Sequence, residues 1–313
     1  FMLHVKSPHR LDQPYIYDNL QGTFSGQFFR NAGMATHPPI PAPRLEIVLG
    51  HSCNGSCLYC DQANIRGNYS STGGQDSGNI ARFIAKLKEL LDRDMPAEHL
   101  EGVLWGGEGL LYIDAIKRIC SGFEGFRKTR WIIPTNARLL RGDVFAWIMR
   151  QSNIYVQVSH DGQSTHEFRG YDPFDDSEVF QNLRALQAEG RIIFNPVLHG
   201  RTVSREETAR FIEYRMGSSC LFGDMKFVYP ANDEIFNRFA MTDDALQAFR
   251  KRELELLFRD KKYVKRDFIQ RTIRNIARSL GNPFVLGYHR DTAQSRHVTV
   301  HLDGSLVWAH SQH

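Results

Sequence analysis

Short apolar runs alternate with segments of helical periodicity through the central part of the chain. The pattern predicts strands at 45–49, 103–105, 131–134, 154–158, 192–197 and 226–229, and helices at 79–93, 113–123, 143–151, 177–189 and 205–216. Parallel strands need a long crossover connection, which is usually a helix, so this order predicts parallel β-α-β units. An open doubly wound sheet and a curved partial barrel both satisfy the pattern. We predict the α/β class, with a partial (β/α)6 barrel of parallel strands.

The pattern divides the chain into three parts. Residues 1–43 carry scattered aromatics and a proline-rich exit, which predicts an irregular or hairpin-like segment before a core at 44–232. In the last part, 233–313, the stretch 242–280 is helical in pattern, and 297–308 alternates as a hairpin around Asp303-Gly304. Lys and Arg outnumber Asp and Glu in this helical stretch, which fits a solvated face or a docking surface for an acidic peptide or redox partner.

Composition and charge narrow the class of protein. The 313 residues are 42% hydrophobic, with a net charge of +4 and a pI of about 8.8, which permits an acidic partner without requiring nucleic acid. We find no signal-peptide pattern and no apolar run of the roughly 18 residues that a membrane span needs. We therefore expect a cytoplasmic protein without a nucleic-acid or membrane partner.

Polar motifs follow the first four predicted strands at the point where each strand ends. They are a cysteine-bearing loop, then Gly106-Gly107-Glu108, then Thr135-Asn136, then Ser159-His160-Asp161-Gly162. Parallel α/β folds bind ligands at the carboxyl ends of their strands, so we expect these motifs to gather at one edge.

The cysteines are few and unevenly spaced. Of five in the chain, Cys53, Cys57 and Cys60 lie on one loop, while Cys120 and Cys220 stand alone. An odd and sparse set argues against a disulfide framework and for a reducing compartment. We interpret the two isolated cysteines as structural.

Three clustered thiolates suit either an iron–sulfur cluster or zinc. Structural zinc normally takes four protein ligands, and only His51, two positions before Cys53, could complete such a site. Three cysteines can instead hold three irons of a cubane and leave the fourth iron open to a chelating molecule. A zinc-stabilised binding module remains the non-enzymatic alternative.

The C-x3-C-x2-C spacing, with Tyr59 before the last cysteine, resembles the signature of the radical S-adenosylmethionine (SAM) superfamily. The resemblance implies one [4Fe–4S] cluster held by Cys53, Cys57 and Cys60, with SAM bound at the open iron and Tyr59 beside the cofactor. It also implies reductive cleavage of SAM to methionine and a 5′-deoxyadenosyl radical, which abstracts hydrogen from a substrate carbon.

The motif after the second strand is similar to the "GGE" motif of that superfamily. The resemblance implies that Gly106 and Gly107 let the backbone approach the cofactor and that Glu108 accepts from the methionyl ammonium. Gly109 stands where the superfamily often has proline.

Two further motifs extend the resemblance. Thr135-Asn136-Ala137 is similar to a "TNG" turn with alanine in place of glycine, which adds Asn136 to the cofactor-binding residues. Ser159 and Arg169 fall in a segment similar to "S-x-DG…R", which implies that they bind the carboxylate or ribose of SAM. No residue is assigned to quenching the substrate radical.

The closest pattern is that of members with SPASM-type extensions, which include sulfatase and peptide maturases. In those extensions a cysteine follows the turn, but here Ala309 follows Asp303-Gly304, and no cysteine follows Cys220. We therefore expect a single cluster. The resemblance implies a peptide or protein side chain as substrate and flavodoxin or ferredoxin as electron donor. A small molecule, such as a sugar, nucleoside or amino acid, is the alternative substrate.

Overall fold

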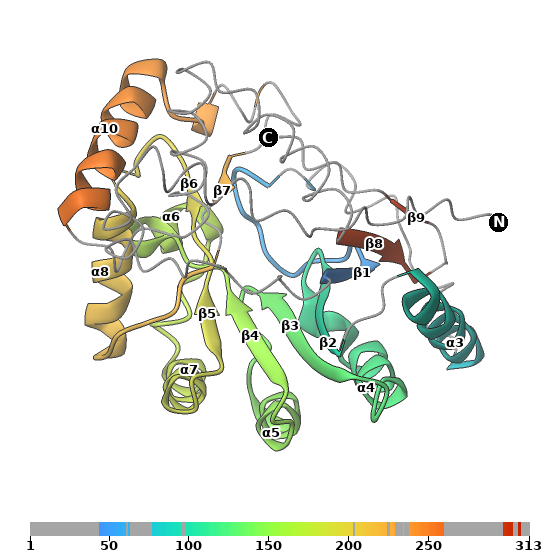
Figure 1. Cartoon of the computed structure of the whole chain (residues 1–313). Helices are drawn as coiled ribbons and strands as arrows, with labels where there is room; N and C mark the ends of the chain where they lie inside the picture. Colours follow the sequence, from blue (N-terminus) through green and yellow to red (C-terminus); the bar gives the residue numbers. More distant parts are fainter. Residues whose placement is uncertain are drawn as a thin grey trace, which may run out of the picture.

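A computed structural model describes residues 44–60, 62, 77–94, 98–202, 204–223, 226–228, 234, 238–259, 297–302 and 306–307. The main sheet has the order β5-β4-β3-β2-β1-β8-β9 (Figure 1). Its strands are β1 (Arg44–Gly50), β2 (His99–Gly106), β3 (Lys128–Thr135), β4 (Ile154–Val158), β5 (Ile192–Phe194), β8 (His297–His301) and β9 (Leu306–Val307).

Strands β1 to β5 are parallel and alternate with helices, which confirms the predicted α/β class. Among the described strands the sheet is open rather than closed on itself, because β5 stands at one end of its order and β9 at the other. The helices and helical turns are α3 (Ser77–Asp94), η2 (Gly109–Tyr112), α4 (Ile113–Gly122), α5 (Gly142–Arg150), η3 (Gly162–Ser164), α6 (Thr165–Arg169), α7 (Ser177–Ala188), α8 (Arg205–Met216) and α10 (Asp243–Arg259).

The predicted strand at 192–197 divides in two at Pro196. Proline has no N–H to donate to a strand ladder, and β5 ends at Phe194 just before it. The chain resumes as β6 (Val197–Leu198), which pairs in parallel with β7 (Lys226–Phe227) in a separate two-stranded sheet. The sixth predicted strand therefore forms, but it pairs with β6 rather than with β5. A parallel bridge between Phe194 and Phe222 keeps the segment before β7 beside β5.

Helices α4, α5 and α7 cover one face of the sheet (Figure 1). Residues alternate between the two faces of a strand, and in β4 Ile154, Val156 and Val158 are fully buried while Tyr155 and Gln157 are partly exposed. The buried set joins the residues of the helices in one core, which includes Leu45, Ile47, Leu104, Ile116, Trp131, Ile148, Leu183 and Ile212. The opposite, inner face carries apolar side chains, such as Val48 and Ile132, together with polar ones, such as Gln157.

Local capping explains where α7 and α8 start and where α8 ends. Asp176 accepts from the N–H of Val179 at the start of α7, and Ser204 accepts from the N–H of Glu207 at the start of α8. Gly217 ends α8 in the left-handed conformation that favours glycine. The structure thus confirms the helix predicted at 205–216, with the same bounds.

The predicted C-terminal hairpin forms, since β8 and β9 pair antiparallel. It also joins the main sheet, because β8 lies parallel to β1, with Arg44 opposite His297. Helix α10 lies within the stretch predicted at 242–280. The predicted N-terminal segment 1–43, the residues 260–296 and Ala309 fall outside the described residues.

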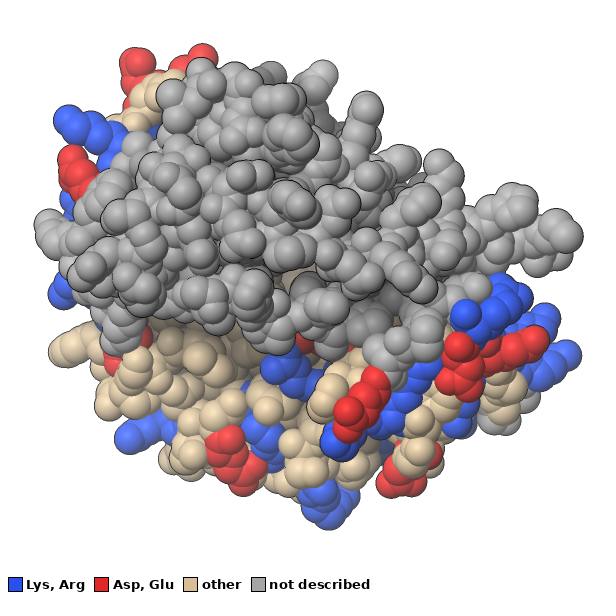
Figure 2. All heavy atoms as spheres, viewed as in Figure 1, with Lys and Arg blue, Asp and Glu red and all other residues tan. Residues whose placement is uncertain are grey.

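On the face seen in Figure 2, acidic and basic side chains of the described residues are intermixed, without a broad patch of one sign. Most of the basic stretch noted in the sequence lies beyond α10 and outside the described residues. In the part of the chain that the structure describes, every helix is too short or too polar to cross a membrane.

Candidate functional site

The cysteine loop begins where β1 ends and is fastened to the end of β2. The N–H of Gly107 donates to the carbonyl oxygen of Gly50, and the N–H of Glu108 donates to that of Ser52, each at a distance of 2.9 Å. Ser52 in turn donates its N–H to the hydroxyl of Tyr112. The two glycines make this contact possible. A Cβ on Gly106 would lie 2.2 Å from the carbonyl oxygen of Gly50, and one on Gly107 would lie 2.4 Å from that of Ser52.

The three thiols of the loop share one neighbourhood. Cys53, Cys57 and Cys60 are all partly buried. A Cβ added to Gly55 would lie 3.4 Å from Sγ of Cys53 and 4.0 Å from Sγ of Cys57, so both sulfur atoms border the same space. Burial raises the pKa of Cys57, the charge of Arg169 opposes this, and the neighbouring Cys60 and Cys53 thiols raise it further. The loop therefore presents all three predicted ligands together.

The chemistry of the three thiols is compatible with an iron–sulfur cluster. Within the described ranges, no three His, Cys, Asp or Glu side chains are arranged to hold one metal ion. Zinc requires its thiolates about 2.3 Å from a common point, whereas a cubane takes each thiolate on a different iron. Three soft thiolates on one loop fit an iron–sulfur cluster.

Glu108 is an internal anchor of the strand ends. Its side chain is 1% exposed, and its carboxylate accepts from the N–H groups of Leu110 and Asn136 and from the hydroxyl of Thr135. Burial raises its pKa, while the hydrogen bonds from Asn136, Thr135 and Leu110 act in the opposite direction. The carboxylate predicted to meet the cofactor is thus bonded to η2 and to the end of β3.

Asn136 joins the end of β3 to the cysteine loop. Its Nδ2 donates to Oδ1 of Asn54 over 2.8 Å, and its Oδ1 accepts from the N–H of Arg138. Next to it, Ala137 has a φ of 67°, the left-handed conformation that favours glycine. Ser159 is half-buried at the end of β4, and its N–H donates to the carbonyl oxygen of Thr135. Both predicted residues therefore lie at the edge where the strands end.

Arg169 is paired inside the protein. Its Nε and Nη2 donate to the two carboxylate oxygens of Asp161 over 2.8 and 2.9 Å. Burial alone would raise the pKa of Asp161, but the charge and hydrogen bonds of Arg169 outweigh it and hold the pKa below its usual range. The hydroxyl of Tyr59 donates to the same carboxylate. The guanidinium of Arg169, which is predicted to bind the SAM carboxylate or ribose, is therefore hydrogen-bonded to Asp161. To reach the cofactor, Arg169 would have to break these bonds.

Two buried histidines complete this region. His160 accepts at Nδ1 from the N–H of Gly162, which leaves Nε2 to donate to Asp172 over 3.1 Å. Burial lowers the pKa of His160, and Asp172 opposes this shift. His199 stacks on the ring of Phe168 at 3.9 Å. Sequence reasoning assigned no role to Asp161 or to the histidines, although Asp161 stood in the "S-x-DG" pattern.

Two buried polar atoms of the inner face, Nε1 of Trp105 and Oδ1 of Asn195, have no hydrogen-bond partner among the residues that the structure describes. Each follows a fully buried core residue, Leu104 or Phe194, so alternation places both side chains on the inner face. A Cβ on Gly223 would lie 2.8 Å from Nε2 of Gln157 and 2.9 Å from Oδ1 of Asn195. These neutral donors and acceptors stand near the ends of β2, β4 and β5.

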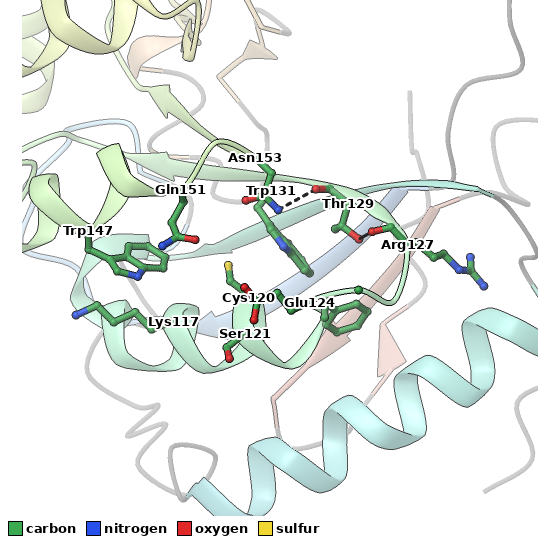
Figure 3. Close-up of a pocket in the computed structure, with 12 residues that line it drawn as sticks. Lys117, Cys120, Ser121, Glu124, Arg127, Thr129, Trp131, Trp147, Gln151 and Asn153 are labelled. Atoms are coloured by element: carbon green, nitrogen blue, oxygen red, sulfur yellow. Dashed lines mark hydrogen bonds between the residues drawn. The ribbon is translucent and has the colours of Figure 1, made fainter.

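A pocket of about 300 Å³ lies elsewhere, between α4, α5 and the start of β3 (Figure 3). Trp131, Trp147, Lys117 and Cys120 help to line it. Burial raises the pKa of Cys120 to about 12, which keeps its thiol neutral. Its lining includes residues that precede β3 and β4, so it lies toward the amino ends of the strands, away from the cysteine loop. We therefore place the candidate active site at the opposite edge.

The sequence matches no protein-family model, and no curated protein matches it. Solved structures do match. Native anSMEcpe with bound AdoMet has a TM-score of 0.46 and 18% identity over 59% of this chain and 51% of that chain. Streptococcus suis SuiB bound to precursor peptide SuiA has a TM-score of 0.49 and 13% identity over 98% of this chain and 67% of that chain.

TYW1 with a lysine-pyruvate adduct bound has a TM-score of 0.31 and 15% identity, over 56% of this chain and 60% of that chain. The chain spans about half the length of the first structures it matches, with 51%, 42% and 50% of those chains covered.

Proposed function

We propose that the protein is a radical SAM enzyme that uses one [4Fe–4S] cluster. The observation that carries the proposal is the cysteine loop itself. Three thiols stand at the carboxyl end of β1, and hydrogen bonds fasten their loop to the ends of β2 and β3.

When bound, a reduced cluster supplies the electron that cleaves SAM to methionine and a 5′-deoxyadenosyl radical, which takes hydrogen from the substrate. The chain's own residues bind and orient the reactants. Cys53, Cys57 and Cys60 hold the cluster, and Gly106 and Gly107 let the loop backbone lie close against β2.

Around the cofactor, Asn136 and Ser159 offer polar groups at the ends of β3 and β4. Tyr59, on the loop itself, is buried and donates its hydroxyl to Asp161. Glu108 keeps the strand ends in place, with the SAM ammonium as a further partner for its carboxylate. Arg169 supplies a positive charge near Cys57.

We further propose a peptide or protein side chain as the substrate. Trp105 and Asn195 offer one unpaired donor and one unpaired acceptor on the inner face. Peptide amides carry a donor and an acceptor without net charge, so they would satisfy both groups. A buried polar group left unpaired is costly, which supports a bound partner there.

The test of the cluster is anaerobic reconstitution with iron and sulfide. We expect about four irons per chain and 5′-deoxyadenosine from SAM, with dithionite or with reduced flavodoxin as the electron donor. Cys57→Ala should lose the cluster, while Cys120→Ala, at the other end of the sheet, should keep it. A colourless protein with one tightly bound zinc would refute the proposal.

The substrate is tested separately. A short peptide encoded beside the gene, added to the reconstituted enzyme with SAM, should change in mass. Turnover of a sugar, nucleoside or free amino acid in its place would favour the small-molecule alternative.

A further inference from the structure

The Asp161 carboxylate joins three separate parts of the chain. It accepts two hydrogen bonds from Arg169 at the end of α6 and one from the hydroxyl of Tyr59. It also accepts one from the N–H of Val197 at the start of β6, at a distance of 2.8 Å. Asp161 is 5% exposed and Arg169 is 8% exposed. The group is therefore an internal junction shielded from water.

Tyr59 is the member of this junction that belongs to the cysteine loop. It stands between Cys57 and Cys60 and is 7% exposed. Its ring lies against Phe168 at 6.1 Å and against His199 at 5.8 Å. The neighbouring Leu58 donates its N–H to the carbonyl oxygen of Phe168 over 2.8 Å. This half of the loop is thus held on α6, as the first half is held on β2.

We propose that Asp161 is a positioning residue for the cysteine loop. Through the Tyr59 hydroxyl it fixes the segment that carries Cys57 and Cys60, and Arg169 balances its buried charge. The purpose of this placement rests on the proposed function, since a fixed loop is what a cluster with three cysteine ligands requires.

Arg169 is essential to this arrangement. A buried carboxylate without a partner is costly, and a bidentate guanidinium satisfies both of its oxygens. The guanidinium also packs on the ring of Tyr59, at 5.5 Å from the ring centre. Asp161, Arg169 and Tyr59 therefore act as one unit.

The experiment measures alkylation of Cys57 by iodoacetamide in the cluster-free full chain, followed by mass spectrometry. Tyr59→Phe keeps the ring and removes the hydroxyl, so we expect Cys57 to react about tenfold faster, as loss of a hydrogen bond to a charged group predicts. Cys120 in the same molecules reports on global unfolding and should not change. Tyr171→Phe, which removes another phenol-to-carboxylate bond, is the matched control and should behave as wild type.

Asp161→Asn leaves Arg169 unpaired and can fail to fold, so it is made together with Arg169→Gln. The amide oxygen of that asparagine still accepts from Tyr59, and we expect its Cys57 labelling to stay near wild type. Asp161→Ala with Arg169→Gln should match Tyr59→Phe. Unchanged labelling in Tyr59→Phe, or equal labelling of the two double variants, would overturn the proposal.

A readout on the loaded protein separates this inference from the proposed function. Removal of iron by a chelator should be about tenfold faster in Tyr59→Phe than in Tyr171→Phe. If wild type takes up no iron while Tyr59→Phe still exposes Cys57, the proposed function fails and the positioning role stands. If wild type takes up iron and its release is equal in both variants, the positioning role fails alone.

Discussion

Asn136 donates from Nδ2 to Oδ1 of Asn54 over 2.8 Å, and this bond links the end of the third strand to the cysteine loop. Sequence reasoning predicted both a site at the strand ends and Asn136 as part of it. The structure adds that Asn136 contacts the loop directly, one residue away from Cys53.

The first prediction concerns Asn136→Ala. We expect a loss of about 1 kcal/mol in the free energy of unfolding, from the missing hydrogen bonds, together with weaker iron retention. Asn153→Ala is the control, because it removes one bond to the carbonyl oxygen of Thr129 at the opposite edge. Denaturant unfolding and iron titration measure the two effects. Equal iron retention in both variants would contradict a role for Asn136 at the loop.

The second prediction concerns Gly107→Ala. Its Cβ would lie 2.4 Å from the carbonyl oxygen of Ser52 and 2.5 Å from that of His51, and backbone atoms cannot move aside cheaply. We expect about 1–3 kcal/mol of destabilisation and loss of cluster binding. Gly125→Ala, with φ of +70° and open space around it, should cost about 1 kcal/mol while keeping the iron. A Gly107→Ala protein with full iron content would contradict the tight contact.

The third prediction concerns Ala137→Gly. A left-handed alanine costs about 1–2 kcal/mol, which glycine removes, although glycine loses more backbone freedom on folding. We expect the variant to be as stable as wild type or up to about 1 kcal/mol more stable. Ala185→Gly, within helix α7, should instead lose about 1 kcal/mol. Thermal unfolding compares them, and equal losses would show that the strain at Ala137 is absent.

The fourth prediction concerns pH. Burial lowers the pKa of His160 from its ordinary value of 6.5. Below pH 6.5, therefore, His160 of the unfolded chain binds a proton that His160 of the folded protein does not. The free energy of unfolding should therefore fall as pH drops below about 6.5, by up to about 1.4 kcal/mol per pH unit.

Urea unfolding of wild type and His160→Gln at pH 7.5 and 5.5 tests this effect. The variant should be less stable at pH 7.5, because packing and the bond to Asp172 change, yet it should lose less on acidification. An identical loss in both proteins would assign the pH dependence to other groups.

Much of the fold was readable from the sequence because its signals are local. The strand at 154–158 and the helix at 205–216 have the predicted bounds, since apolar spacing and caps determine them. The break at Pro196 also had a local sign, as proline cannot donate within a ladder. The pairing of β8 with β1 had none, because nothing near His297 indicates which strand it will meet.

For the candidate site, too, some features were predictable from the sequence and others were not. Motif spacing predicted that Glu108, Asn136 and Ser159 lie at one edge, where the structure places them. The partner of Arg169 was not predictable, because the turn between Asp161 and Arg169 decides whether the guanidinium faces inward or outward. The left-handed Gly162 and the helical turns after it direct it inward.

The place of β8 affects how the protein is made. Strand β1 carries the cysteine loop and lies between β2 and β8, yet Arg44 meets its partner His297 only after the ribosome has passed the intervening chain. Until then one edge of β1 offers unpaired backbone groups, which invite pairing with other chains. Pairings so distant in sequence also form slowly. Synthesis of this protein thus has a late step at the strand from which the cysteine loop starts, and a chain stopped before β8 would leave that edge open.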